Sequence, residues 1–61
     1  MPADYTGKTV IVTGGAKGIG KGIVVVFAEQ GANVIAADVD VEAGHQLESE
    51  TAELPGKVVF S

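Results

Sequence analysis

The residues with the clearest chemical potential are the glycines at positions 14, 15, 18, 20 and 22. The β-branched run Thr9–Thr13 precedes them, and an apolar segment with helical spacing follows. A glycine-rich loop in that setting lets backbone N–H groups approach a phosphate, and the positive end of the helix dipole favours the anion. The pattern predicts a phosphate site built from backbone at residues 14–20, with a purely structural glycine turn as the alternative.

Apolar runs and helix-breaking residues predict the elements that position this loop. They are, in order, a strand at 9–13, a helix from the loop to Gly31, a strand at 33–38, a helix of about a dozen residues after the N-cap Asp40, and a strand at 57–61. The order is βαβαβ, and crossovers of this length give parallel strands. The predicted fold class is α/β, a Rossmann-type unit with a three-stranded parallel sheet.

The first helix is predicted to pack one apolar stripe, formed by Ile19, Ile23, Val26 and Phe27, against the sheet. The β-branched residues Val24–Val26 oppose helix formation locally, so tertiary packing must override their propensity. Gly22 also weakens a helix, and the favoured interpretation is that its missing side chain lets helix and sheet approach closely.

Right-handed crossovers in one direction put both helices on the same face of the sheet. The first two strands are apolar at successive positions, so the opposite face would expose a hydrophobic surface. Residues 1–61 are therefore expected to be the incomplete, N-terminal part of a dinucleotide-binding domain and the first half of a doubly wound fold. The remainder of such a domain, or a partner chain, is expected to cover the bare face.

The segment Thr13–Gly20 reads Thr-Gly-x-x-x-Gly-x-Gly, and Asp38 ends the second predicted strand. Together with the phrase Gly31–Val34, this pattern resembles the short-chain dehydrogenase/reductase family, and the resemblance covers essentially the whole chain. It implies an NAD(P)-binding oxidoreductase that interconverts alcohols and carbonyls by hydride transfer. It also implies that a complete relative is often a homo-oligomer.

The cofactor predicted is NAD rather than NADP. Asp38 lies close to the offset of about 20 residues at which an acid accepts hydrogen bonds from the adenosine ribose. Its charge would repel a 2′-phosphate unless Lys17 compensates, and Lys17 is free to swing into solvent. The resemblance further implies that Gly14, Gly18 and Gly20 shape the loop. It also implies that Lys17 and Ile19 lie near the cofactor and that Val39 touches the adenine, although Ile19 can equally be read as core.

No catalytic residue is predicted. The family's Asn-Asn-Ala-Gly segment and its catalytic Ser with Tyr-x-x-x-Lys do not occur in this sequence. Tyr5 precedes the first strand and has Lys8 at the wrong spacing, which favours a packing role. These 61 residues alone are expected to be inactive.

Three alternatives remain at this point. Gly15, Gly20 and Lys21 match most of a P-loop, but Gly22 stands where a Ser or Thr would hold Mg²⁺. A methyltransferase would also place glycines after the first strand and an acid after the second. A non-catalytic truncated fragment, with a tendency to associate through its bare sheet face, is the third.

Composition excludes several other classes. The chain has 61 residues, a formal net charge of −4 and no cysteine. Its four basic residues are scattered, so neither nucleic acid nor a membrane surface is a predicted partner. No metal site is predicted, because His45 has no second strong ligand nearby. Without a signal or membrane segment, the cytoplasm is the default expectation. The remaining acids are interpreted as a solvated face: Glu42, Glu48, Glu50 and Glu53.

Overall fold

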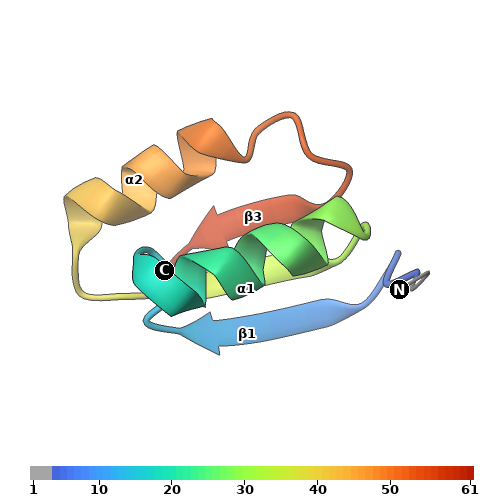
Figure 1. Cartoon of the computed structure of the whole chain (residues 1–61), viewed down its shortest axis with the longest axis horizontal. Helices are drawn as coiled ribbons and strands as arrows, with labels where there is room; N and C mark the ends of the chain where they lie inside the picture. Colours follow the sequence, from blue (N-terminus) through green and yellow to red (C-terminus); the bar gives the residue numbers. More distant parts are fainter. Residues whose placement is uncertain (1–3) are drawn as a thin grey trace.

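The computed structural model describes residues 4–61 and has the predicted βαβαβ order (Figure 1). The elements are β1 (Thr9–Thr13), α1 (Gly18–Glu29), β2 (Asn33–Ala37), α2 (Val41–Glu50) and β3 (Lys57–Phe60). The sheet is parallel throughout, with the spatial order β1-β2-β3. The predicted fold class is thus confirmed: this is one half of a Rossmann-type, doubly wound fold. The second and third strands end one residue earlier than predicted.

The strand register aligns residues in rows across the three strands. Val10, Val34 and Val58 are aligned across the three strands, and Ile11, Ile35 and Val59 form the next row. Because successive side chains of a strand point to opposite faces, the two rows lie on opposite sides of the sheet. The Val10 row packs with the core, whereas Ile11 is 67% and Val59 40% exposed.

Both helices cover the same face of the sheet. Helix α1 packs on the strands and crosses in front of the sheet in Figure 1, while α2 packs on β3. The opposite face carries the row of Ile11, Ile35 and Val59 and has no helix over it. The expectation of a bare apolar sheet face is therefore confirmed for residues 4–61.

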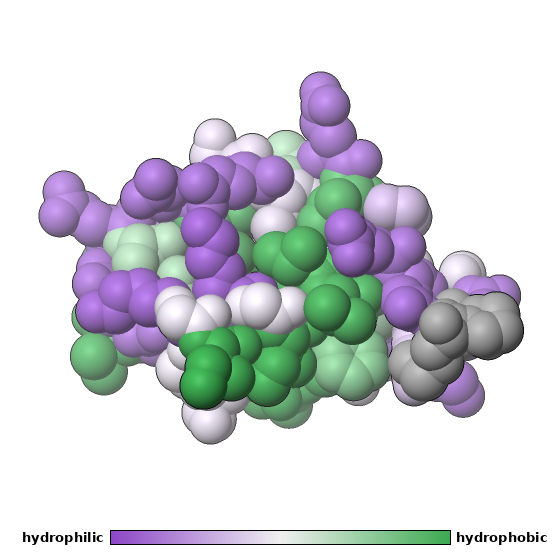
Figure 2. Space-filling model, in the orientation of Figure 1, coloured by the Kyte–Doolittle hydropathy of each residue, from purple (hydrophilic) through white to green (hydrophobic). Residues whose placement is uncertain are grey.

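The predicted packing face of α1 is wrong. Ile19, Ile23 and Val26 are 87%, 41% and 48% exposed, whereas Val24 and Ala28 are fully buried. Figure 2 shows apolar surface along α1 on the side turned away from the sheet. Of the predicted stripe only Phe27 is partly buried against the core.

The physical reason for this rotation lies in Gly20. A Cβ at Gly20 would collide with the backbone carbonyl of Gly14, so this side of the helix must face the loop. Residues four and eight positions further along lie on the same side of a helix. Val24 and Ala28 are therefore turned toward the sheet together with Gly20.

The close-packing role assigned to Gly22 is also wrong, because a Cβ there would meet no atom within 4 Å. The glycine that brings a helix against the sheet is Gly44 in α2, where a Cβ would overlap the ring of Phe60. Gly22 lies on the exposed side of α1, so its missing side chain serves no contact.

The predicted helix ends are confirmed. Gly31 follows α1 with a positive φ of 90°, and its N–H donates to the Ala28 carbonyl at 3.1 Å. The N–H of Ala32 donates to the Phe27 carbonyl at 3.2 Å, which completes a Schellman motif. At the start of α2, the Asp40 Oδ1 accepts from the Ala43 N–H at 3.0 Å.

Two acids that were predicted to be merely solvated have partners. The Glu48 Oε2 accepts a hydrogen bond from the Phe60 N–H at 2.9 Å, which ties α2 to the edge strand β3. Glu50 pairs with Lys21 across the two helices, with Oε1 and Nζ 2.6 Å apart. Tyr5 packs edge-on against Phe27, with the two ring centroids 5.1 Å apart, which is consistent with its predicted packing role.

No helix within residues 4–61 has the length and apolar character needed to cross a membrane.

Candidate functional site

The glycine-rich loop turns sharply between β1 and α1. Gly14 and Gly18 have φ values of 67° and 59°, a region that only glycine adopts easily. The Gly14 N–H donates to the Ala37 carbonyl at 2.6 Å, so the start of the loop is held against the end of β2. The missing side chain of Gly20 lets the first turn of α1 rest on Gly14.

The N-terminus of α1 is open. Its N-cap residue, Lys17, forms no side-chain cap, and its first turn contains no acid. The first N–H groups of any α-helix have no partner within the helix, and the helix dipole concentrates positive charge there. Helix α2 differs, because Asp40 caps it and Glu42 lies in its first turn. The start of α1 is therefore the helix terminus suited to an anion.

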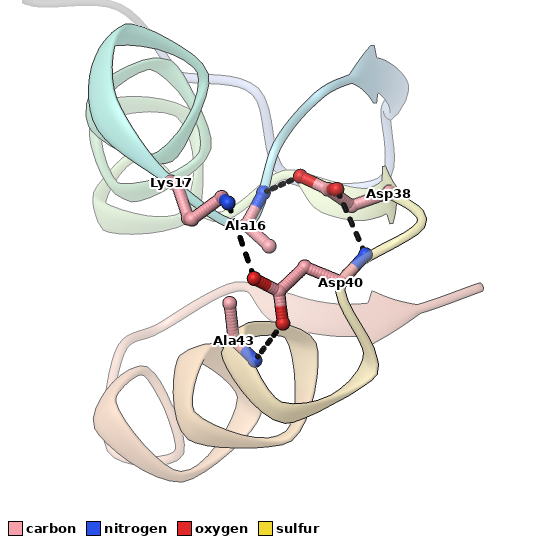
Figure 3. A network of polar contacts seen from close by, with 5 residues as sticks. All are labelled: Ala16, Lys17, Asp38, Asp40 and Ala43. Atoms are coloured by element: carbon pink, nitrogen blue, oxygen red, sulfur yellow. Dashed lines mark hydrogen bonds and ion pairs between the residues drawn. The ribbon is translucent and has the colours of Figure 1, made fainter.

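Asp38 fastens the loop to the sheet (Figure 3). Its Oδ2 accepts a hydrogen bond from the Ala16 N–H at 3.2 Å, and its Oδ1 accepts from the Asp40 N–H at 3.1 Å. These backbone donors stabilise the carboxylate form, with the Asp40 N–H first, and lower the pKa of Asp38 below its usual value. Asp38 is thus an ionised, rigidly held acceptor at the end of β2.

Lys17 does not pair with Asp38. Its Nζ lies 3.1 Å from the Asp40 Oδ2, with the lysine side chain 65% and the aspartate side chain 36% exposed (Figure 3). The hydrogen bond from the Ala43 N–H, and then that from Lys17, lower the pKa of Asp40. Lys17 is thus paired with Asp40 while its side chain remains largely exposed, and its ability to swing into solvent stays a prediction.

A hollow lies at the carboxyl ends of the strands. It brings together the predicted residues Gly14, Asp38 and Val39 with Ala37 and Ser61. Val39 is 97% exposed at its rim. Ser61 is not among the predicted site residues. Its position directly after β3 is the signal that indicates it, because parallel strands bring their carboxyl ends to one edge of the sheet.

A second hollow lies between the two helices. Lys17 and Gly18 line it together with the Lys21 and Glu50 ion pair. Ile19 projects from the start of α1 and is 87% exposed, so its interpretation as core is excluded. The hollow at the strand ends is the better candidate site, because it joins a carboxylate to the turn of the glycine loop.

The side chains and backbone around this hollow are suited to binding a ligand. Asp38 is an acceptor and Val39 supplies an apolar rim, while the start of α1, which supplies N–H donors, lines the second hollow. Within the described part of the chain, no three His, Cys, Asp or Glu side chains gather as a metal site. The arrangement suits a ligand that carries both a phosphate and a hydroxyl-bearing ring.

The P-loop alternative finds no support in this geometry. Lys21, which would reach the phosphates in a P-loop, is held by Glu50 on α2.

Comparison with known proteins identifies the family of this chain. The family model described as "short chain dehydrogenase" matches residues 8–61. L-fucose dehydrogenase from Bos taurus is 52% identical over 58 residues, which cover 95% of this chain and 20% of the relative. The chain thus spans about a fifth of the length of the curated relatives it matches.

Solved structures share the fold. The Pseudomonas aeruginosa RhlG/NADP active-site complex is 28% identical, with a TM-score of 0.86 over 98% of this chain and 24% of the other. A 7α-hydroxysteroid dehydrogenase complexed with NADH and 7-oxo glycochenodeoxycholic acid is 34% identical, with a TM-score of 0.87 over 95% of this chain and 23% of the other. With the family model matching from Lys8 onward, this chain belongs to the short-chain dehydrogenase family.

Proposed function

We propose that this chain binds NAD through the glycine-rich loop and the carboxyl end of the sheet. The pyrophosphate lies at the open start of α1, shaped by Gly14, Gly18 and Gly20, with Lys17 and Ile19 beside it. The adenosine ribose donates hydrogen bonds to Asp38, and the adenine rests on Val39. The observation that carries the proposal is the uncapped start of α1, together with the hydrogen bond from the Ala16 N–H of the preceding loop to the Asp38 carboxylate.

The choice of NAD over NADP rests on Asp38. Solved relatives include complexes named with NADP and with NADH, so membership of the family leaves the choice open. The Asp38 carboxylate lies in the hollow at the strand ends and is held there by two backbone donors. A 2′-phosphate placed beside it would suffer charge repulsion at close range.

The wider role follows from the family. We assign to residues 1–61 the cofactor-binding part of a short-chain oxidoreductase that transfers hydride between NAD and an alcohol or carbonyl. The row of Ile11, Ile35 and Val59 is the surface that the second half of such a domain, or a partner chain, would cover. No catalytic residue is assigned within this sequence.

Calorimetric titration of the 61-residue chain with NAD and NADP tests the proposal. Wild type is expected to favour NAD by roughly tenfold, and Asp38→Ala is expected to lose that preference. Asp4→Ala is the matched control, since it removes the same charge from an exposed side chain that, among residues 4–61, accepts from the Thr6 N–H. Binding of neither cofactor would favour the alternative, a folding or interaction fragment without cofactor function.

A further inference from the structure

Asp38 and Asp40, at the end of β2 and the start of α2, make different polar contacts. Both Asp38 carboxylate oxygens accept from backbone N–H groups, whereas Asp40 gives one oxygen to the Ala43 N–H and the other to Lys17. Figure 3 shows the Lys17 side chain beside Ala16, whose N–H is bonded to Asp38, with its ammonium turned to Asp40. Lys17, whose charge acts on Asp38 at the proposed ribose site, is therefore engaged by the second aspartate.

Lys17 is close enough to Asp38 for its charge to act on that carboxylate. Its charge contributes, as the smallest of several effects, to lowering the pKa of Asp38. Lys21, the other lysine in the groove between the helices, is held by Glu50 at 2.6 Å. Lys17 is thus the cation at this loop whose release would change the charge presented to a phosphate on the ribose.

We infer that Asp40 is a specificity-determining residue, which excludes a 2′-phosphorylated nucleotide by holding the Lys17 ammonium away from the ribose at Asp38. The inference rests on the proposed NAD function of the same site. Asp38 supplies the repulsion, and Asp40 removes the counter-charge that would offset it.

The expected effect is modest. Both partners are partly exposed, and ion pairs of this kind are worth little in water. Release of Lys17 should therefore improve binding of the phosphorylated nucleotide by roughly threefold rather than by orders of magnitude. Asp40→Asn is the suitable change, because asparagine caps a helix as well as aspartate and the start of α2 is retained.

The test is an NMR titration of the 61-residue chain with AMP and with adenosine 2′,5′-bisphosphate, which detects weak binding. The readout is the ratio of the two affinities in wild type, Asp40→Asn, Lys17→Met and the double variant. We expect Asp40→Asn to shift the ratio roughly threefold toward the bisphosphate and the shift to vanish when residue 17 is Met. An unchanged ratio, or an equal shift without the lysine, would overturn the inference.

Glu50→Gln is the matched control, since it removes a carboxylate that pairs with the other lysine of the same groove. It should leave the ratio unchanged. A wild-type ratio near one would count against the NAD proposal, while the change on Asp40→Asn would still decide the role of Asp40.

The ion pair is also tested without nucleotide. Because Lys17 contributes to lowering the pKa of Asp40, Lys17→Met should raise that pKa in a carboxyl-carbon NMR titration. An unchanged Asp40 titration would show that the pair does not form in solution and would overturn the inference.

Discussion

At the scale of single residues, Asp38 holds the shape of the loop and is also the residue on which the proposed cofactor preference rests. Its carboxylate is an acceptor for the Ala16 and Asp40 N–H groups in the free chain. Each oxygen retains lone pairs, since a carboxylate has about four acceptor sites. The same group can therefore hold the loop and still accept hydrogen bonds from a ribose.

The first prediction concerns acid. The pKa values of Asp38 and Asp40 are lowered from 3.8 by backbone hydrogen bonds, so the unfolded chain binds protons at higher pH than the folded chain. The stability that these carboxylates contribute is fully present above pH 3.8 and is lost as the pH falls through their folded pKa values. Urea unfolding at a series of pH values from about 5 to about 2 measures this loss.

Asp38→Asn should flatten that decline, because one of the linked carboxyls no longer titrates. An identical pH dependence in wild type and variant would assign the acid sensitivity to other carboxyls of the chain.

The second prediction contrasts two glycines of α1. Gly20→Ala would place a methyl group against the Gly14 carbonyl and should lower the free energy of unfolding by about 1–3 kcal/mol. Gly22→Ala meets open space in a helix and should raise it by about 1 kcal/mol. Chemical denaturation measures both, and a destabilised Gly22→Ala would restore the close-packing role that the structure denies.

At the scale of elements, α1 shows how packing selects one of two apolar stripes. One stripe contains Ile19, Ile23 and Val26, and the other contains Val24 and Ala28. The second is buried because Gly20, four residues before Val24, must face the loop. Burial of Val24 also offsets the poor helix propensity of the valine run.

The third prediction compares the same Val→Ala substitution in the buried and in the exposed stripe of α1. Val24→Ala removes fully buried methyl groups and should lower the free energy of unfolding by about 2 kcal/mol. Val26→Ala, at a position 48% exposed, should be neutral or stabilise the chain by up to about 0.5 kcal/mol through helix propensity. Equal effects in urea denaturation would mean that both stripes are packed.

At the scale of the whole molecule, the two faces of the sheet have unequal surroundings. Helices cover Val10, Val12 and Val34, while Ile11 and its row face outward without a covering layer. Parallel sheets in α/β proteins are normally covered on both faces. The exposed row therefore favours association with another apolar surface.

The fourth prediction uses adjacent residues of β1 that point to opposite faces. Ile11→Thr should reduce self-association of the 61-residue chain in sedimentation velocity and leave its stability nearly unchanged. Val12→Thr, on the covered face, should lower the free energy of unfolding by about 1–3 kcal/mol, because it buries a hydroxyl. A chain that is already monomeric with Ile11 in place would argue against association through this face.

The sequence by itself determined the order of the elements, their parallel pairing and the position of the glycine loop. Strand and helix residues follow local periodicity, and Asp40 and Gly31 mark helix ends through contacts made within a few residues. The family was also readable, since Gly14 to Gly20 and Asp38 keep a fixed spacing. Their roles toward NAD remain predictions.

Only the tertiary structure decided which stripe of α1 is buried and which acid holds Lys17. Periodicity gives the angular spacing of side chains but not the rotation of a helix that carries two apolar stripes, and contact between Gly20 and Gly14 fixes that rotation. The partner of a long charged side chain likewise depends on distance in space. Lys17 and Asp40 are separated in the chain by α1 and β2. They pair because parallel strands bring the loop after β1 beside the start of α2.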